Sequence, residues 1–482
     1  MTPHLTRRVP ALLLTVVAFA AIVITARTTP TTVAPLFSSV RAEWMPFAPP
    51  AGGLTQTWFC PGVPATGEDG VGGELVVANA GSTEISADVM LLNDERTTVK
   101  LVVTVAPHER TLVDVDAALT GQIVSAVVEV DGGGAIVEQR AFHPAGIAVS
   151  PCANSPSANW YLADGFTVGD SRNQIVLTNP YDDAVIVDVG FATVDGSRTP
   201  SRYQGYPIEG HSVKIIDLGV AGEGAQGEEV LAVKVESTRG QLIVGRLQHF
   251  TSGGRLGFTM SLAAPALRSQ WWFAAGEKGS GIDERFSLFN PTGDDVAIDV
   301  VFLGTGADPL DPIVVPARQV VTFDPGEVTG LGEGRHAAVF ATLAEPSIVV
   351  ERALTKIVDG QPSTSVVLGA VPRLEDGFVA SSWTMAVGPT VPTEDALVVF
   401  NVDNAEGTVT VEAVGANGPV AIPGLETVAL APAGLVTIDL TDAAALDRQL
   451  VVRSTTQIMV ERSLPAGEGL GRSGSWALPE SD

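Results

Sequence analysis

Residues 271–291, WWFAAGEKGSGIDERFSLFNP, contain the pattern that decides the fold of this chain. Aromatic residues open the segment, and a hydrophobic run ends in asparagine about twenty residues later. The opening recurs along the 482-residue chain at Trp58, Trp160, Trp272 and Trp383. The nearly constant distance between successive openings indicates tandem copies of one domain.

Two further markers repeat in the same order. The hydrophobic runs end at similar intervals in Asn79, Asn179, Asn290 and Asn401. An apolar run near the end of each unit reaches an arginine, at Arg140, Arg246, Arg352 and Arg462. All three markers share one period, and they predict four repeats, at residues 57–157, 158–269, 270–381 and 382–482.

Each repeat consists of short runs rich in Val, Ile and Thr, which alternate with period two between Gly, Pro, Asn and Asp. This pattern is typical of strands and turns. In the second repeat it predicts strands near residues 159–163, 174–178, 184–194, 212–217, 229–236, 241–250 and 255–263. The expected fold is all-β, with four tandem Ig-like β-sandwiches of about 105 residues each. The alternative is an eight-bladed, propeller-like ring, in which Trp476 begins a strand that closes the ring instead of completing the fourth sandwich.

The N-terminus predicts a membrane segment. Arg7 and Arg8 precede an uncharged, mostly apolar run from Val9 to Ala26, which is long enough to span a bilayer. We expect residues 1–27 to form an uncleaved signal anchor with its N-terminus inside and the bulk of the chain outside the cell. Cleavage of this segment and secretion is the alternative. The Thr/Pro-rich residues 28–56 are expected to form an extended stalk.

Composition excludes some classes of function. The chain has 55 acidic and 28 basic residues and a formal charge of −27, which disfavours binding to nucleic acid. The sequence lacks G-x-S-x-G, H-E-x-x-H and P-loop motifs, so no catalytic residue is proposed and the chain is expected not to be an enzyme. No cofactor is expected.

The two cysteines, Cys60 and Cys152, lie near the start and end of the first repeat. Outside the cell a disulfide between them would persist, and two separate buried thiols are the alternative. Neither cysteine has a close second Cys or His, which argues against a metal site.

The repeated arginines share strand parity with apolar residues, so we expect them to face inward and to need a carboxylate. Glu351 is expected on the opposite face from Arg352. Candidate partners are acids before the repeated asparagines or after Pro turns: Asp114, Asp283, Glu284, Asp324, Glu394, Asp395 and Asp439. Calcium binding by the same acids is a weaker alternative.

The repeated tryptophans are expected in the core, with stacking on carbohydrate as the alternative. All four tyrosines fall in the second repeat, at Tyr161, Tyr181, Tyr203 and Tyr206, which makes that repeat the best place for a ligand surface.

Several of these segments resemble an actinobacterial surface-repeat family, domain of unknown function 5719, whose units open Trp-Tyr-Phe-Ala-Glu-Gly. The resemblance covers about residues 57–482 and is strongest in repeats two and three. It rests on Trp-Tyr-Leu-Ala-Asp-Gly165, Trp-Trp-Phe-Ala-Ala-Gly276, Leu-Thr-Asn-Pro180, Leu-Phe-Asn-Pro291, Val-Pro-Ala-Arg318 and Val-Glu-Arg-Ala353. The first and fourth openings depart from it, with Trp-Phe-Cys-Pro61 and Trp-Thr-Met-Ala-Val-Gly388. The resemblance implies export and assigns no activity.

Together these features predict a non-enzymatic, membrane-anchored protein of the cell envelope. Its partners would be a cell-wall polymer or another envelope protein, with the membrane contacted through the N-terminal helix. The alternative is an accessory or hydrolytic protein acting on extracellular glycan, because paired carboxylates are not visible from sequence spacing.

Overall fold

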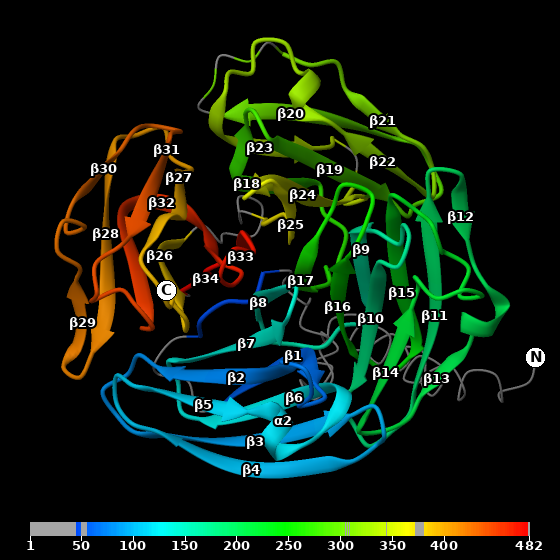
Figure 1. Ribbon diagram of the computed structural model, residues 1–482, viewed down its shortest axis with the longest axis horizontal. Coiled ribbons are helices and arrows are strands. Elements are labelled where there is room, and N and C mark those ends of the chain that lie inside the picture. The colour runs from blue at the N-terminus through cyan, green and yellow to red at the C-terminus, as the bar shows by residue number, and fades with distance from the viewer. Residues whose placement is uncertain are drawn as a thin grey trace, which may run out of the picture. The chain divides into compact units, whose positions relative to one another are not determined.

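The computed structural model describes residues 45–49, 55–303, 305, 307, 309–343, 345–371 and 380–480. The predicted anchor, residues 1–27, and most of the predicted stalk lie outside the described residues. Residues 43–482 belong to one compact unit. The regular elements are almost entirely strands (Figure 1), which confirms the all-β class.

The elements fall into four groups that follow the sequence repeats. Repeat 1 contains β1 (Thr55–Ala65), β2 (Gly72–Asn79), β3 (Ile85–Asn93), β4 (Thr98–Val105), β5 (Arg110–Asp114), α2 (Val115–Ala118), β6 (Gly121–Asp131), β7 (Ala135–His143) and β8 (Gly146–Pro151). Repeat 2 contains β9 (Asn159–Gly165), β10 (Arg172–Asn179), β11 (Val185–Thr193), β12 (Gly196–Arg198), the 3-10 helix η2 (Ser201–Tyr203), β13 (Tyr206–Ile208), β14 (Ser212–Asp217), β15 (Leu231–Arg239), β16 (Ile243–Phe250) and β17 (Gly257–Leu262).

The second half of the chain repeats this order. Repeat 3 contains β18 (Gln270–Lys278), β19 (Ile282–Asn290), β20 (Val296–Leu303), β21 (Ile313–Val315), β22 (Gln319–Phe323), the 3-10 helix η3 (Pro325–Glu327), β23 (Gly334–Ala341), β24 (Val349–Val358) and β25 (Gln361–Leu368). Repeat 4 contains β26 (Ala380–Met385), β27 (Thr393–Asn401), β28 (Gly407–Gly415), β29 (Gly418–Ala421), β30 (Val428–Leu430), β31 (Leu435–Leu440), β32 (Leu450–Pro465), β33 (Arg472–Trp476) and β34 (Leu478–Pro479).

Each of the first three repeats is built from two separate antiparallel sheets. In repeat 1 the strand orders are β1-β6-β3-β4 and β5-β2-β7-β8, and in repeat 3 they are β18-β23-β20-β21 and β22-β19-β24-β25. Buried and exposed residues alternate along β3 (Ile85–Asn93), so this strand buries one face. Burial of one face is expected for a sheet with one side in a core. The sandwich prediction is therefore confirmed for these repeats.

Repeat 4 differs because one strand belongs to both of its sheets. The first half of β32 pairs with β26 and β28, and its second half pairs with β27 and β33. In repeat 2 the corresponding strands β15 and β16 are separated at Gly240, whose φ is +83°. Residues 453–457 of repeat 4 contain neither Gly nor Pro, so nothing there favours a break in the strand.

Strands β8, β17, β25 and β33, one from each repeat, lie near a common centre (Figure 1). Strand β17 contacts β8 and β25, and β33 contacts β25 and β8. The fourth repeat is thus in contact with the first, and the repeats form a closed succession. This closure is a feature shared with the ring alternative, whereas Trp476 lies in β33 and completes the fourth repeat by pairing with Glu461 of β32.

Candidate functional site: the junctions between repeats

The repeated tryptophans are core residues. The indole Nε1 of Trp160 donates to the carbonyl of Leu242 at 3.0 Å, and repeats 3 and 4 show the same bond from Trp271 to Ile348 and from Trp383 to Ile458, both at 2.8 Å. Trp58 is also buried. Because these rings lie inside the sheets, they are not available to stack on a sugar.

The third repeat corrects the predicted register. Trp271, and not Trp272, takes the core position, since Trp271 is fully buried and makes the same indole bond as the tryptophans of repeats 2 and 4. Trp272 is half-buried, with its ring 5.9 Å from that of Phe400 in repeat 4. Adjacent strand residues face opposite sides of a sheet, so a shift of one residue exchanges the core face for the junction face.

The repeated asparagines hold turns together. The side-chain nitrogen of Asn290 donates to the carbonyls of Asp294, Val315 and Pro316, and its oxygen accepts from the amide of Thr292. Asn79 and Asn179 each donate to three carbonyls in the same way, and Asn401 donates to two. All four asparagines are buried. Their role is to satisfy backbone groups between the two sheets of a repeat.

Three of the repeated arginines pair with a glutamate of the following repeat. The guanidinium of Arg246 forms two bonds of 3.0 Å to Glu351. Glu351 also accepts from the backbone amides of Ala163 at 2.7 Å and Asp164 at 2.6 Å, in the opening strand of repeat 2. One carboxylate of repeat 3 therefore binds both the arginine and the opening strand of repeat 2.

The same arrangement links the next two junctions. Arg352 of repeat 3 pairs with Glu461 of repeat 4, which accepts from the amides of Ala274 and Ala275. Arg462 of repeat 4 pairs with Glu138 of repeat 1 through bonds of 3.0 and 2.6 Å. Glu138 also accepts from the amide of Ala386 at 3.1 Å.

The main partners of the repeated arginines were not among the candidate acids, and the predicted pairing is found only for Arg352, as a longer ion pair with Glu284. Of those acids, Glu284 does approach Arg352, at 3.8 Å, and lies 2.8 Å from His336. The other candidates have other contacts or local roles. Asp283 and Asp324 pair with Arg285, and Asp114 caps α2. Asp439 accepts a hydrogen bond from the amide of Asp395, and the Asp395 carboxylate pairs with Arg335. The backbone carbonyl of Glu394 accepts from Arg472.

The junction between repeats 1 and 2 lacks this ion pair, and three residues differ together. In the strand register, Gln139 takes the place of the repeated arginine and Gly245 takes the place of the glutamate. Pro61 stands where the other opening strands provide an amide, and proline has no N–H. A Cβ on Gly245 would lie 2.6 Å from Pro61, so a side chain here would collide with the opening strand.

Gln139 keeps the hydrogen bond to an amide of the opening strand, although its side chain carries no charge. Its side-chain oxygen accepts from the amide of Gly62 at 3.1 Å. Arg140, which was predicted to be the equivalent of the other arginines, is one position out of register. It pairs instead with Glu74 of its own repeat and lies over the ring of Phe142. The loss of arginine, glutamate and amide at one junction leaves no buried charge without a partner.

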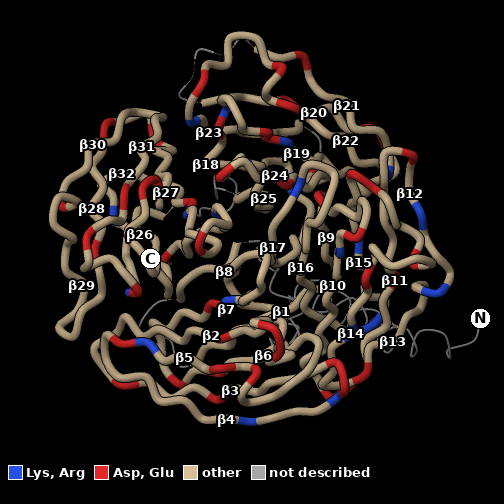
Figure 2. The backbone as a smooth tube through the Cα atoms, in the orientation of Figure 1, with Lys and Arg blue, Asp and Glu red and all other residues tan. Residues whose placement is uncertain are grey.

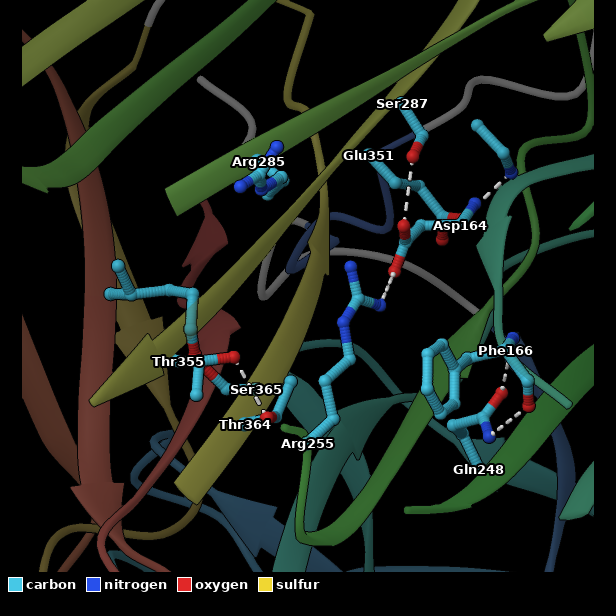
Figure 3. A network of polar contacts seen from close by, with 12 residues as sticks. Asp164, Phe166, Gln248, Arg255, Arg285, Ser287, Glu351, Thr355, Thr364 and Ser365 are labelled. Carbon is cyan, nitrogen blue, oxygen red and sulfur yellow. Dashed lines mark hydrogen bonds and ion pairs between the residues drawn. The ribbon is translucent and has the colours of Figure 1, made fainter. Parts of the chain in front are cut away.

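A second polar network crosses the junction between repeats 2 and 3 (Figure 3). The carboxylate of Asp164 accepts from Ser287 of repeat 3 at 2.8 Å and from Arg255 at 3.1 Å. The amide group of Gln248 bonds both backbone groups of Phe166, at 2.8 and 3.2 Å. Side chains of these two repeats are therefore fixed against one another.

Two histidines lie at the junction between repeats 1 and 2. The rings of His143 and His249 are 4.5 Å apart, and His143 stacks on Phe258 at 4.7 Å. Burial and the neighbouring His249 lower the pKa of His143 to about 4. Burial, followed by Arg172, lowers the pKa of His249. The Nδ1 of His143 accepts from the amide of Ala145 at 3.0 Å, so a proton on that nitrogen would break the bond.

The predicted disulfide is present between Cys60 and Cys152, with Cα atoms 4.4 Å apart. The neighbouring Phe59 and Ala153 exchange two backbone hydrogen bonds of 2.8 Å. The bond therefore joins the first and last segments of repeat 1.

The four tyrosines of repeat 2 do not form one shared ligand surface. Tyr161 and Tyr203 are buried, Tyr206 is half-buried against Tyr203, and Tyr181 is 42% exposed. Among the residues that the structure describes, no group of three or more His, Cys, Asp or Glu side chains has an arrangement that could hold a metal ion. Calcium binding stays an untested expectation.

No helix within the described ranges is long and apolar enough to span a membrane.

Comparison with known proteins gives only weak structural similarities. No protein-family model matches the chain and no curated protein matches it, so the resemblance to domain of unknown function 5719 stays a prediction. A Thermotoga maritima structure, protein 1070, has a TM-score of 0.20 and 11% identity over 21% of this chain and 93% of its own.

Two other solved structures have lower scores. A Streptomyces avermitilis α-L-rhamnosidase complexed with L-rhamnose has a TM-score of 0.14 and 10% identity, over 83% of this chain and 55% of its own. A tetra-tandem repeat from the extending region of a large adhesion protein has a TM-score of 0.10 and 12% identity, over 84% of this chain and 94% of its own. Scores this low carry no functional argument.

Proposed function

We propose that this protein is a non-enzymatic scaffold of the cell envelope, which holds a compact four-repeat body outside the membrane and binds a cell-wall polymer or an envelope protein. The observation that carries this proposal is that the repeated polar residues have structural roles. Arg246, Arg352 and Arg462 are buried and paired across junctions, and the repeated asparagines hold turns. Residues that recur once per repeat thus maintain the architecture.

The disulfide supports the compartment. Disulfides persist in oxidising environments outside the cytoplasm and are rare within it, so the Cys60–Cys152 bond indicates an extracytoplasmic location. The proposed anchor in residues 1–27 agrees with that location and would tether the body to the membrane. The formal charge of −27 favours solubility of the body and disfavours close approach to polyanionic polymers.

Co-sedimentation of the full chain with isolated cell wall tests this proposal. The purified chain, kept in a mild detergent, is mixed with wall material with and without calcium, and with wall from which the glycan has been digested. We expect sedimentation that depends on intact wall, with chain unfolded by heating as the control. If the folded chain stays in solution in every condition, direct wall binding is wrong, and cross-linking in intact cells would then test for a protein partner.

A further inference from the structure

An open cleft lies at the junction between repeats 3 and 4. It has a volume of about 430 Å³ and is lined by Arg335 of β23, Lys356 of β24, Arg472 of β33, and the hydroxyl-bearing residues Thr393 and Ser463. Two carboxylates, Asp359 and Asp395, also line it, so the basic side chains outnumber the acidic ones by one. This volume is within the range of small-molecule sites in proteins. Figure 2 shows acidic residues distributed over much of the backbone, so three basic side chains in one cleft stand out in a chain with a formal charge of −27.

The three cations share few counter-charges. Arg335 and Lys356 both pair with the same oxygen of Glu277, and Arg335 has a longer contact of 3.6 Å to the exposed Asp395. Arg472 donates to two uncharged acceptors, the carbonyls of Glu394 at 2.7 Å and Ser463 at 3.3 Å. Among the described residues, Arg472 has no carboxylate within ion-pair distance.

The charged groups of the cleft are also partly removed from water. Burial, followed by the charge of Arg335, lowers the pKa of Lys356. Burial lowers the pKa of Arg472 by more than the neighbouring Asp395 raises it. An anion in the cleft would stabilise both charged forms.

The turn beside Arg472 is rich in glycine. Gly467, Gly469 and Gly471 line the cleft and all have positive φ values, of +133°, +69° and +80°. A Cβ on Gly471 would lie 2.2 Å from the hydroxyl oxygen of Ser363. The three basic side chains also line a small cavity of about 30 Å³ behind the cleft, which has room for little more than a water molecule. The available ligand space is therefore in the open cleft.

We propose that the cleft between repeats 3 and 4 binds a small oxyanion, a phosphate or carboxylate group, through Arg472 and Lys356, with Arg335 supporting them. A guanidinium matches the two oxygens of such a group, and the Lys356 ammonium supplies a second charge. This site does not depend on the scaffold role, since it requires only the folded junction of repeats 3 and 4.

Calorimetric titration of the full chain in mild detergent tests this site at pH 7 and constant ionic strength. The ligands are inorganic phosphate, glucuronate as the carboxylate, and glucose as the uncharged control. We expect saturable binding of at least one anion and none of glucose, and the comparison of the two anions identifies the group that the site prefers.

Four variants locate the binding. Arg472→Gln is expected to weaken binding about tenfold, Arg472→Lys to weaken it less, and Lys100→Gln, the same charge change on the exposed strand β4, to leave it unchanged. Circular dichroism checks folding, and Lys356→Gln provides a second test if Arg472→Gln does not fold. Absence of saturable anion binding to the folded chain, or equal binding by the folded cleft variants, overturns the proposal.

Discussion

Replacing Glu138 by Gln tests whether the buried ion pair between repeats 4 and 1 closes the succession of repeats. Glu138 and Arg462 are fully buried and lie 324 positions apart in sequence. Glutamine keeps the shape and one acceptor oxygen but leaves the charge of Arg462 without its partner. Breaking one side of a buried pair costs about 3 to 5 kcal/mol, and we expect about 3 kcal/mol because the shape is kept.

This cost has a defined effect on thermal unfolding. Unfolding entropy is about 2.1 cal/mol/K per residue. If residues 43–482 unfold as one unit, a loss of about 3 kcal/mol lowers the melting temperature by only about 3 °C. Urea unfolding is therefore the primary measurement of the free energy of unfolding, with Glu95→Gln on an exposed turn as the matched control, expected within about 0.5 kcal/mol of the parent.

A double-mutant cycle separates the ion pair from other effects. Arg462→Met alone should destabilise the chain because it leaves the Glu138 charge buried, whereas the double variant should cost at least about 2 kcal/mol less than the sum of the single changes. Hydrogen exchange at the Ala386 amide, which donates to Glu138, should also become faster in Glu138→Gln. Additive single effects, or a loss below about 1 kcal/mol for each, would refute the reasoning.

Three further predictions concern residues within and between repeats. Because folding lowers the pKa of His143 to about 4 and lowers that of His249, the unfolded chain binds more protons below pH 6.5. Stability should therefore fall from pH 6.5 towards pH 4, by about 1 to 2 kcal/mol after allowance for solvent screening at these half-buried rings. Urea unfolding at pH 7 and pH 5 should show a smaller loss for His143→Phe than for the parent, because only His249 still contributes, and an undiminished loss would show that other groups titrate. Asn290→Ala removes three side-chain donations to backbone carbonyls and should cost about 2 to 3 kcal/mol in urea unfolding, so a change below about 0.5 kcal/mol would contradict its role in the turn. Trp271→Phe should lower the free energy of unfolding by about 2 kcal/mol or more, and Trp272→Phe by less than about 1 kcal/mol. If Trp272→Phe has the lower melting temperature, Trp272 and not Trp271 is the core residue, as the sequence predicted.

Much of the strand pattern was predictable from sequence. In the second repeat, all seven predicted strands correspond to observed ones, for example 212–217 to β14 and 241–250 to β16. The short strands β12 and β13 were not predicted, because three-residue strands leave too little alternation to recognise. The disulfide was predictable because the chain has two cysteines, and because its N-terminal sequence predicts export.

The residues that join the repeats were harder to predict from sequence. The sequence Glu-Arg occurs at the end of repeats 3 and 4, so a signal for the glutamates was present. Strand parity correctly separates Glu351 from Arg352, but it does not reveal that Arg246, Arg352 and Arg462 each meet a glutamate of the following repeat. That pairing depends on how sheets that are far apart in sequence face each other.

The all-β class and the four-repeat organisation could be predicted from the amino-acid sequence, because alternation and turn residues act locally and recur with a visible period. The tertiary structure was needed to show that Gln139, Gly245 and Pro61 form one junction without a buried ion pair, while the other three junctions carry buried ion pairs. These three residues are far apart in sequence, and their compatibility is a matter of close approach, as the position of Pro61 against Gly245 shows. The physical reason is that periodicity specifies which side of a strand is buried, whereas the partner on that side is chosen by packing between repeats.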